Sequence, residues 1–97
     1  MLFRSENFRP GTLTKLGFDY ASLAPTHPRL IYCSISGFGH TGPRSSEPGY
    51  DAVMQGEGGL MSITGPAGDR GYRLGVAITD ITSGMFAAHA KIGRAHV

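Results

Sequence analysis

Residues 74–89 read Leu74-Gly-Val-Ala-Ile-Thr-Asp-Ile-Thr-Ser-Gly-Met-Phe-Ala-Ala-His89, an apolar run followed by a segment with helical spacing. The apolar run, residues 74–78, predicts a short buried strand. Ile81, Met85 and Ala88 then share one face of a helix, because residues three and four positions apart meet on the same side. This stretch therefore predicts a strand that leads directly into a helix.

Asp80 lies where the predicted helix begins. Thr79 or Asp80 is expected at the N-cap, where a side-chain oxygen accepts a backbone hydrogen bond. If Thr79 is the cap, Asp80 falls in the first turn, and the helix dipole favours its ionised form by about 0.3–1 kcal/mol. The stretch by itself leaves two interpretations open, a structural cap and a chemically active carboxylate.

The chain is short and contains few bulky apolar residues. Its 97 residues include 15 glycines and no tryptophan. Such a length allows at most one small domain, and a chain of this size buries only about 60–65% of its unfolded surface. We therefore expect a piece of a larger protein. No apolar run reaches the roughly 18 residues of a membrane span and no signal peptide is expected, which favours a cytoplasmic protein. The single Cys33 excludes a disulfide framework and is expected to be buried.

The two ends of the chain resemble translated sequencing adapter. Residues 92–97 look like a common short-read adapter read in frame, with Lys91 at the junction, and residues 1–5 look like its reverse complement. We therefore expect residues 1–5 and 91–97 to be artefactual and residues 6–90 to be part of one domain. The codons test this directly. Without the ends, six Lys and Arg face seven acidic residues and the net charge changes from +2 to −1. This removes the basic signal for a nucleic-acid partner.

The rest of the chain alternates between strand and helix signals. We expect the end of a strand at residues 6–8, short helices at 10–16 and 19–23, a buried strand at 30–35, a loop at 36–49, a helix at about 50–62 and a turn at 65–71. Gly17 is expected to end the first helix and Asp19 to cap the second. Each glycine in the predicted helix at about 50–62 costs about 1 kcal/mol relative to Ala, so tertiary contacts must stabilise that helix. The alternation predicts an α/β fold with a parallel, Rossmann-like sheet.

Two local signals point to binding sites that the context does not favour. Gly37-Phe-Gly-His-Thr-Gly42 fits a dinucleotide-binding pattern, but that site needs a helix to start at once, and Pro43 continues the loop. No His or Cys pair has metal-ligand spacing, so no metal site is expected. Arg9, Lys15 and Arg44 could hold phosphates, but as scattered cations they are expected to be solvated.

Seven short motifs nevertheless form an ordered set. They are Glu6-Asn-Phe-Arg-Pro-Gly11, Pro28-Arg-Leu-Ile-Tyr32, Ser36-Gly-Phe-Gly39, Thr41-Gly-Pro43, Pro48-Gly-Tyr-Asp51, Gly59-Leu-Met-Ser-Ile-Thr-Gly65 and Gly75-Val-Ala-Ile-Thr-Asp80. Together they resemble the class III CoA-transferases, a family that includes formyl-CoA transferase, relatives of carnitine CoA-transferase and α-methylacyl-CoA racemase. The resemblance covers residues 6–90.

The resemblance implies part of the large domain of a much longer chain that forms an interlocked homodimer. It implies acyl-CoA and a carboxylic acid as substrates, with no permanently bound cofactor and neither nucleic acid nor membrane as a partner. Asp80 matches the nucleophile, and the helix N-terminus would offer amides to developing negative charge. The implied CoA-binding residues are Asn7, Phe8 and Arg9 along CoA, Lys15 near its phosphates, and Tyr50 and Asp51 beside the thioester.

Two alternatives to the transferase remain at this point. The racemase has His at the position of Tyr50, where it exchanges a proton together with the residue matching Asp80. Tyr has a pKa near 10 and is a poor proton shuttle at neutral pH, so the transferase is preferred. The second alternative is an α/β fragment without catalytic function. In either case we expect these 97 residues alone to be inactive and poorly folded.

Overall fold

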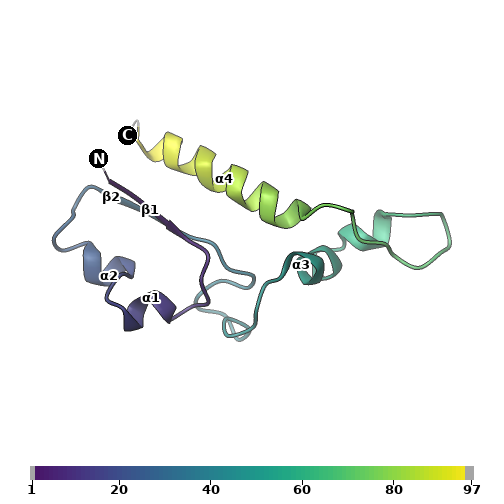
Figure 1. Cartoon of the computed structure of the whole chain (residues 1–97), viewed down its shortest axis with the longest axis horizontal. Helices are drawn as coiled ribbons and strands as arrows, with labels where there is room; N and C mark the ends of the chain where they lie inside the picture. The colour runs from purple at the N-terminus through teal and green to yellow at the C-terminus, as the bar shows by residue number, and fades with distance from the viewer. Residues whose placement is uncertain (1, 96–97) are drawn as a thin grey trace.

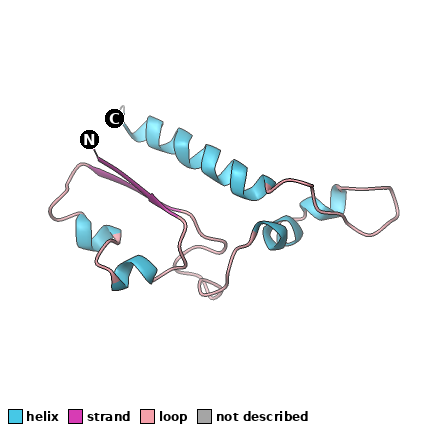
Figure 2. Ribbon diagram, viewed as in Figure 1, coloured by secondary structure: helices cyan, strands magenta, loops and turns pink. Residues whose placement is uncertain are grey.

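The computed structural model describes residues 2–95, in which two strands alternate with short helices before one long helix (Figures 1 and 2). The elements are β1 (Leu2–Glu6), α1 (Thr12–Lys15), α2 (Tyr20–Leu23), β2 (Leu30–Ser34), α3 (Asp51–Glu57), the 3-10 helix η1 (Leu60–Ile63) and α4 (Ile78–Ala95).

The strands β1 and β2 form a parallel pair with α4 along one side. Their register runs from Leu2 opposite Leu30 to Glu6 opposite Ser34. Helix α4 packs against β2 and α3, whereas α1 and α2 lie on the other side of the strands (Figure 1). A parallel pair needs a crossover connection, which α1 and α2 provide here. The predicted α/β fold with a parallel sheet is confirmed.

Local signals predicted several boundaries correctly. Helix α1 ends before Gly17, whose φ of 73° suits a residue without a side chain. Asp19 is the N-cap of α2, and its carboxylate accepts a hydrogen bond from Ser22 Oγ at 2.5 Å. The expected helix at 50–62 is divided at Gly58 and Gly59, because Gly59 takes a φ of 81° that ends α3 and starts η1.

The predicted strand at residues 74–78 is wrong. Residues 74–77 form a loop, and Ile78 already belongs to α4. The hydrogen bonds of this loop's backbone do not go to a neighbouring strand. The Leu74 N–H donates to Gln55 Oε1 at 2.8 Å, and the Val76 carbonyl accepts from the Ile78 N–H at 2.8 Å. Since a buried backbone group needs a partner, a polar side chain here replaces the sheet ladder.

Helix α4 differs from the prediction at its start. It begins at Ile78, so Thr79 and Asp80 lie within the first turn and neither is the N-cap. The position of Asp80 in the first turn is as expected. Ile81 and Met85, which were expected to share one helix face, are 50% and 56% exposed, because the described chain covers a different side of the helix.

The described chain buries little apolar surface. Leu13 is its single buried hydrophobic residue, and the half-buried Cys33 of β2 is not the fully buried thiol that was expected. The Cα radius of gyration is 16.4 Å, with extents of 55 × 30 × 19 Å, whereas about 13 Å is typical of a compact 100-residue domain. Polar contacts therefore carry much of the tertiary organisation.

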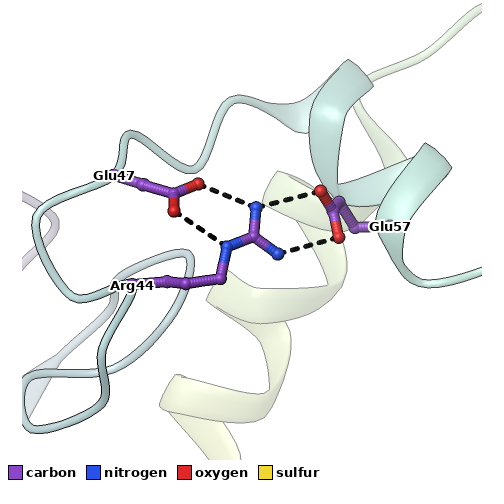
Figure 3. Close-up of polar contacts among 3 residues, drawn as sticks. All are labelled: Arg44, Glu47 and Glu57. Atoms are coloured by element: carbon purple, nitrogen blue, oxygen red, sulfur yellow. Dashed lines mark hydrogen bonds and ion pairs between the residues drawn. The ribbon is translucent and has the colours of Figure 1, made fainter.

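One such contact anchors the loop at residues 36–49 to α3. Arg44 lies between Glu47 and Glu57 and donates two hydrogen bonds to each, from 2.7 to 3.0 Å (Figure 3). Its guanidinium also stacks 4.0 Å from the centre of the Phe38 ring. Hydrogen bonds to Glu47 and Glu57 raise the pKa of Arg44. The Arg44 side chain stays partly solvated, as expected, with 43% of it exposed, but its pairing with two carboxylates was not predicted.

The same loop closes through the backbones of Gly37 and Gly49. A Cβ on Gly37 would lie 2.5 Å from the Gly49 Cα, and one on Gly49 would overlap the Gly37 backbone. No helix follows Gly42, so the glycines of the dinucleotide-like pattern belong to a closed loop. The pattern is a false match, as predicted from Pro43.

We expect Gly49→Ala to lower the free energy of unfolding by about 1–3 kcal/mol, because the new methyl group forces the two backbones apart. Gly42→Ala is the matched control, since its Cβ would meet only the Phe38 carbonyl at 3.7 Å. Urea denaturation followed by circular dichroism measures both variants. Equal stability of the two variants would contradict the close approach.

Candidate functional site

A cavity of about 780 Å³ opens where the strands end and α4 begins. Its lining comes from four parts of the chain: residues 5–10 at and after the end of β1, residues 35–37 after β2, residues 47–50 with Met54, and residues 79, 80, 83 and 84 of α4. Parallel strands bring their carboxyl ends to one edge, which is where α/β proteins place ligand sites. The cavity lies at that edge.

Asn7, Phe8 and Arg9, which the family resemblance implied lie along CoA, line this cavity. The buried carboxylate of Glu6 holds the turn that presents them. Glu6 Oε2 accepts the Phe8 N–H at 2.9 Å, and its Oε1 accepts the hydroxyl of Ser34 at the end of β2. Glu6 is only 9% exposed, so these bonds compensate its burial and join the two strand ends.

Asp80 and Tyr50 line the same cavity from two other elements. Asp80 is exposed in the first turn of α4, and Tyr50, the residue before α3, is 66% exposed. Among residues 2–95, no side chain donates a hydrogen bond or forms an ion pair to the Asp80 carboxylate. Its oxygen lone pairs therefore remain available to a ligand.

The carboxylate of Asp51, the first residue of α3, caps α4. Its Oδ1 accepts the Thr79 N–H at 2.8 Å, the Thr79 hydroxyl at 2.6 Å and the Asp80 N–H at 3.4 Å. The hydrogen bond from the Thr79 side chain is the main cause that lowers the pKa of Asp51, and Gln55 adds to it. An ionised Asp51 therefore does for α4 what Thr79 or Asp80 was predicted to do.

This cap alters one expectation about the helix N-terminus. The amides of Thr79 and Asp80 are bonded to Asp51, and those of Ile78 and Ile81 donate to the carbonyls of Val76 and Ala77. The expectation that the first amides of α4 are free to bind developing negative charge is therefore wrong. The long 3.4 Å bond of the Asp80 N–H is the weakest of the four.

Two of the predicted site residues lie outside the cavity lining. Lys15 is exposed at the end of α1, and Asp51 faces the start of α4. Glu6 and Gln55 are polar residues that the sequence reasoning missed. The usable signals were an acidic residue at the end of a strand, and a Gln four positions after Asp51 on one helix face.

Within residues 2–95, no group of three His, Cys, Asp or Glu side chains is placed to hold a metal ion. None of the helices in that range has both the length and the apolar character that crossing a bilayer requires.

Comparison with known proteins shows the family to which this chain belongs. The pattern of CoA-transferase family III matches residues 4–95. Succinate–glutarate CoA-transferase of Agrobacterium fabrum is 48% identical over 85 residues, which cover 88% of this chain and 21% of that protein. Acetyl-CoA:oxalate CoA-transferase of Acetobacter aceti is 47% identical over 83 residues, 84% of this chain and 21% of the relative.

A solved structure has the same fold over nearly the whole chain. The crystal structure of a CAIB/BAIF family protein from Brucella suis superimposes with a TM-score of 0.89 at 46% identity, covering 95% of this chain and 24% of that one. This chain thus spans about a fifth of the length of the curated relatives that it matches.

The lowered pKa of Asp51 predicts how stability depends on pH. Because the folded state binds that proton more weakly, the cap is fully present above the unfolded value of about 3.9 and is lost as pH falls through the folded value. Asp51→Asn cannot titrate, so its stability should fall less steeply with acid. At neutral pH it should be less stable, since its amide nitrogen would face Gln55 Nε2, donor to donor.

Urea unfolding at a series of pH values measures both effects against the unmodified chain. Asp19, Glu47, Glu57 and Asp69 also have lowered pKa values, and they contribute equally to both proteins. An identical acid dependence of the two would show that Asp51 does not cap α4 as an anion.

Proposed function

We propose, because this chain belongs to CoA-transferase family III, that it carries the nucleophile and part of the acyl-CoA site of an enzyme that moves coenzyme A from an acyl-CoA to a carboxylic acid. The observation that carries the proposal is the Asp80 carboxylate, which has no hydrogen-bond donor among residues 2–95 and lines the cavity shared with residues 7–9. A carboxylate without bound donors keeps its lone pairs for attack on a carbonyl carbon.

The reaction proceeds through two kinds of covalent intermediate on Asp80. A carboxylate oxygen attacks the thioester carbonyl carbon, the carbon–sulfur bond breaks, and CoA leaves as thiolate with a mixed anhydride on the enzyme. The thiolate then attacks the aspartyl carbonyl, releasing the donor acid and leaving an aspartyl-CoA thioester. The acceptor carboxylate then attacks the aspartyl carbonyl of this thioester and releases CoA thiolate, which leaves a second mixed anhydride. The thiolate attacks the acceptor's acyl carbonyl, which gives the acceptor's CoA thioester and returns Asp80 as a carboxylate. Each step exchanges one activated acyl group for another, so none needs an oxidant or a metal ion.

The other site residues would bind CoA rather than react. Asn7, Phe8 and Arg9 follow a single turn held by Glu6, which presents an amide, an aromatic face and a guanidinium along one wall. Lys15 would meet the CoA phosphates as a point charge outside the cavity. Tyr50 and Asp51 would border the thioester, with Asp51 acting through its hold on α4.

The acceptor is expected to be a small dicarboxylic acid, because two similar relatives are named for glutarate and oxalate. We further propose that residues 6–90 function within a longer cytoplasmic enzyme that forms an interlocked homodimer. The 97 residues alone should not catalyse CoA transfer, since the relatives are about five times as long. Residues 1–5 and 91–97 remain proposed adapter sequence, to be tested on the codons.

A chimera tests the role of Asp80. In it, residues 6–90 replace the matching segment of the Agrobacterium fabrum succinate–glutarate CoA-transferase. With succinyl-CoA and hydroxylamine present, we expect an aspartyl hydroxamate on Asp80, detected by peptide mass spectrometry. Asp80→Ala should lower turnover by at least about 10³-fold, as loss of a covalent nucleophile does.

Asp69→Ala is the matched control, because Asp69 is an exposed aspartate bonded to Tyr72 outside the cavity. Its turnover should stay near that of the chimera. Unchanged CoA transfer by Asp80→Ala would refute the nucleophile assignment. Loss of α-deuterium from the substrate without a covalent adduct would instead indicate the racemase reaction.

A further inference from the structure

Gln55 is a fully buried polar side chain whose hydrogen-bonding groups are all used. It is 0% exposed, within α3. Its Nε2 donates to Asp51 Oδ2 at 2.7 Å and to the Val76 carbonyl at 3.3 Å, and its Oε1 accepts the Leu74 N–H at 2.8 Å. Since a side-chain amide offers two N–H donors and one oxygen, this arrangement permits only one orientation of the amide.

Through Asp51, this orientation is transmitted to α4. The two oxygens of a carboxylate are rigidly joined, so a bond that holds Oδ2 also sets the direction of Oδ1. Oδ1 is the atom that accepts the Thr79 and Asp80 amides. A continuous chain of hydrogen bonds therefore runs from Gln55 through Asp51 to the first turn of α4, which carries Asp80.

We infer that Gln55 is a positioning residue, which fixes the Asp51 carboxylate in the direction that caps α4 and thereby sets where the Asp80 carboxylate stands in the cavity. Gln55 does not line the cavity, whereas its neighbour Met54 does, so it acts only through other groups. The catalytic part of this inference rests on the proposed function. The structural part, the orientation of the cap, does not.

The chemistry of the Gln55–Asp51 contact provides a test that distinguishes a positioning residue from one that only fills space. Gln55→Glu keeps the shape of the side chain but places a second carboxylate against Asp51 Oδ2. Two carboxylates at this distance share one proton and repel each other once it is lost. The other titratable groups in the segments around this contact are Tyr50 and Glu57 at the two ends of α3, Asp80 in α4 and Arg73 beside Leu74, while η1 and residues 74–77 carry none.

The double variant Gln55→Glu/Asp51→Asn reverses donor and acceptor across the same contact. The introduced amide nitrogen can donate to the introduced carboxylate, and the amide oxygen can still accept the Thr79 N–H. No proton is shared in this arrangement, so the cap should again persist at neutral and higher pH. A residue that acts only by filling space would gain nothing from the second substitution.

Hydrogen exchange at Thr79 in the chimera, measured by mass spectrometry of peptides that contain it, reports the cap without reference to catalysis. We expect Gln55→Glu to protect Thr79 as the unmodified chimera does at acidic pH and to lose at least about tenfold in protection as the pair loses its proton. The double variant should regain that protection. Amides in β2 serve as the internal control for folding, and Gln55→Met should lose Thr79 protection at every pH.

The kinetic arm uses the chimera, with kcat and KM for CoA transfer measured over the same pH range. Gln55→Glu should lose kcat by up to about 10²-fold as pH rises, with KM for acyl-CoA little changed, because a small displacement of Asp80 impairs attack more than binding. A Gln55→Glu protein whose Thr79 exchange and kcat both follow the unmodified pH profile would overturn the inference. Absence of CoA transfer in the chimera with Gln55 intact would refute the proposed function, while Thr79 exchange would still decide the positioning role.

Discussion

The contact between the Asp51 carboxylate and the first turn of α4 joins the parts of the molecule that apolar packing does not join. One oxygen of Asp51 accepts from Thr79 and Asp80, and the other accepts from the fully buried Gln55. Gln55 in turn binds the backbone at Leu74 and Val76. Helix α3, the loop at residues 74–77 and α4 are thus held by one polar network in a chain with a single buried hydrophobic residue among those described.

The network gives the two aspartates different chemical environments at the same helix terminus. Asp51 receives donors on both of its oxygens, and hydrogen bonds to the charged form keep a carboxylate ionised. Asp80 lies in the first turn of the helix with no side-chain donor among residues 2–95, and it lines the cavity. Bound donors make one carboxylate a structural anion, and their absence leaves the oxygens of the other accessible to a ligand, which the proposed role of Asp80 as a nucleophile requires.

The second wall of the cavity, formed by residues 7–9, is also held by polar contacts, which come from the ends of the parallel strands. Glu6 at the end of β1 bonds both to the Phe8 amide and to Ser34 at the end of β2. The strand pair and its terminal carboxylate therefore determine where residues 7–9 stand relative to α4, which itself packs on β2. Each wall of the site is thus held by a buried or half-buried polar side chain, Glu6 on one side and Asp51 on the other.

Local features of this protein follow from the sequence alone. The helix stop at Gly17, the cap at Asp19 and the place of Asp80 in a first turn depend on residues within a few positions of one another. The parallel α/β order followed from the alternation of strand and helix signals along the chain. The sequence also contains seven ordered motifs that resemble the family. Of the site residues that this resemblance implied, Asn7, Phe8, Arg9, Tyr50 and Asp80 line the cavity, whereas Lys15 and Asp51 do not.

Only the tertiary structure determined which group caps α4 and whether residues 74–77 form a strand. Thr79 and Asp80 are good capping residues by local rules, but a carboxylate 28 positions away reaches the same amides. The apolar run at Leu74 suits a strand equally well, but Gln55, 19 positions earlier, takes its backbone hydrogen bond. Hydrogen bonds depend on distance and direction in space, so a competitor brought in by the fold can displace a neighbour in sequence.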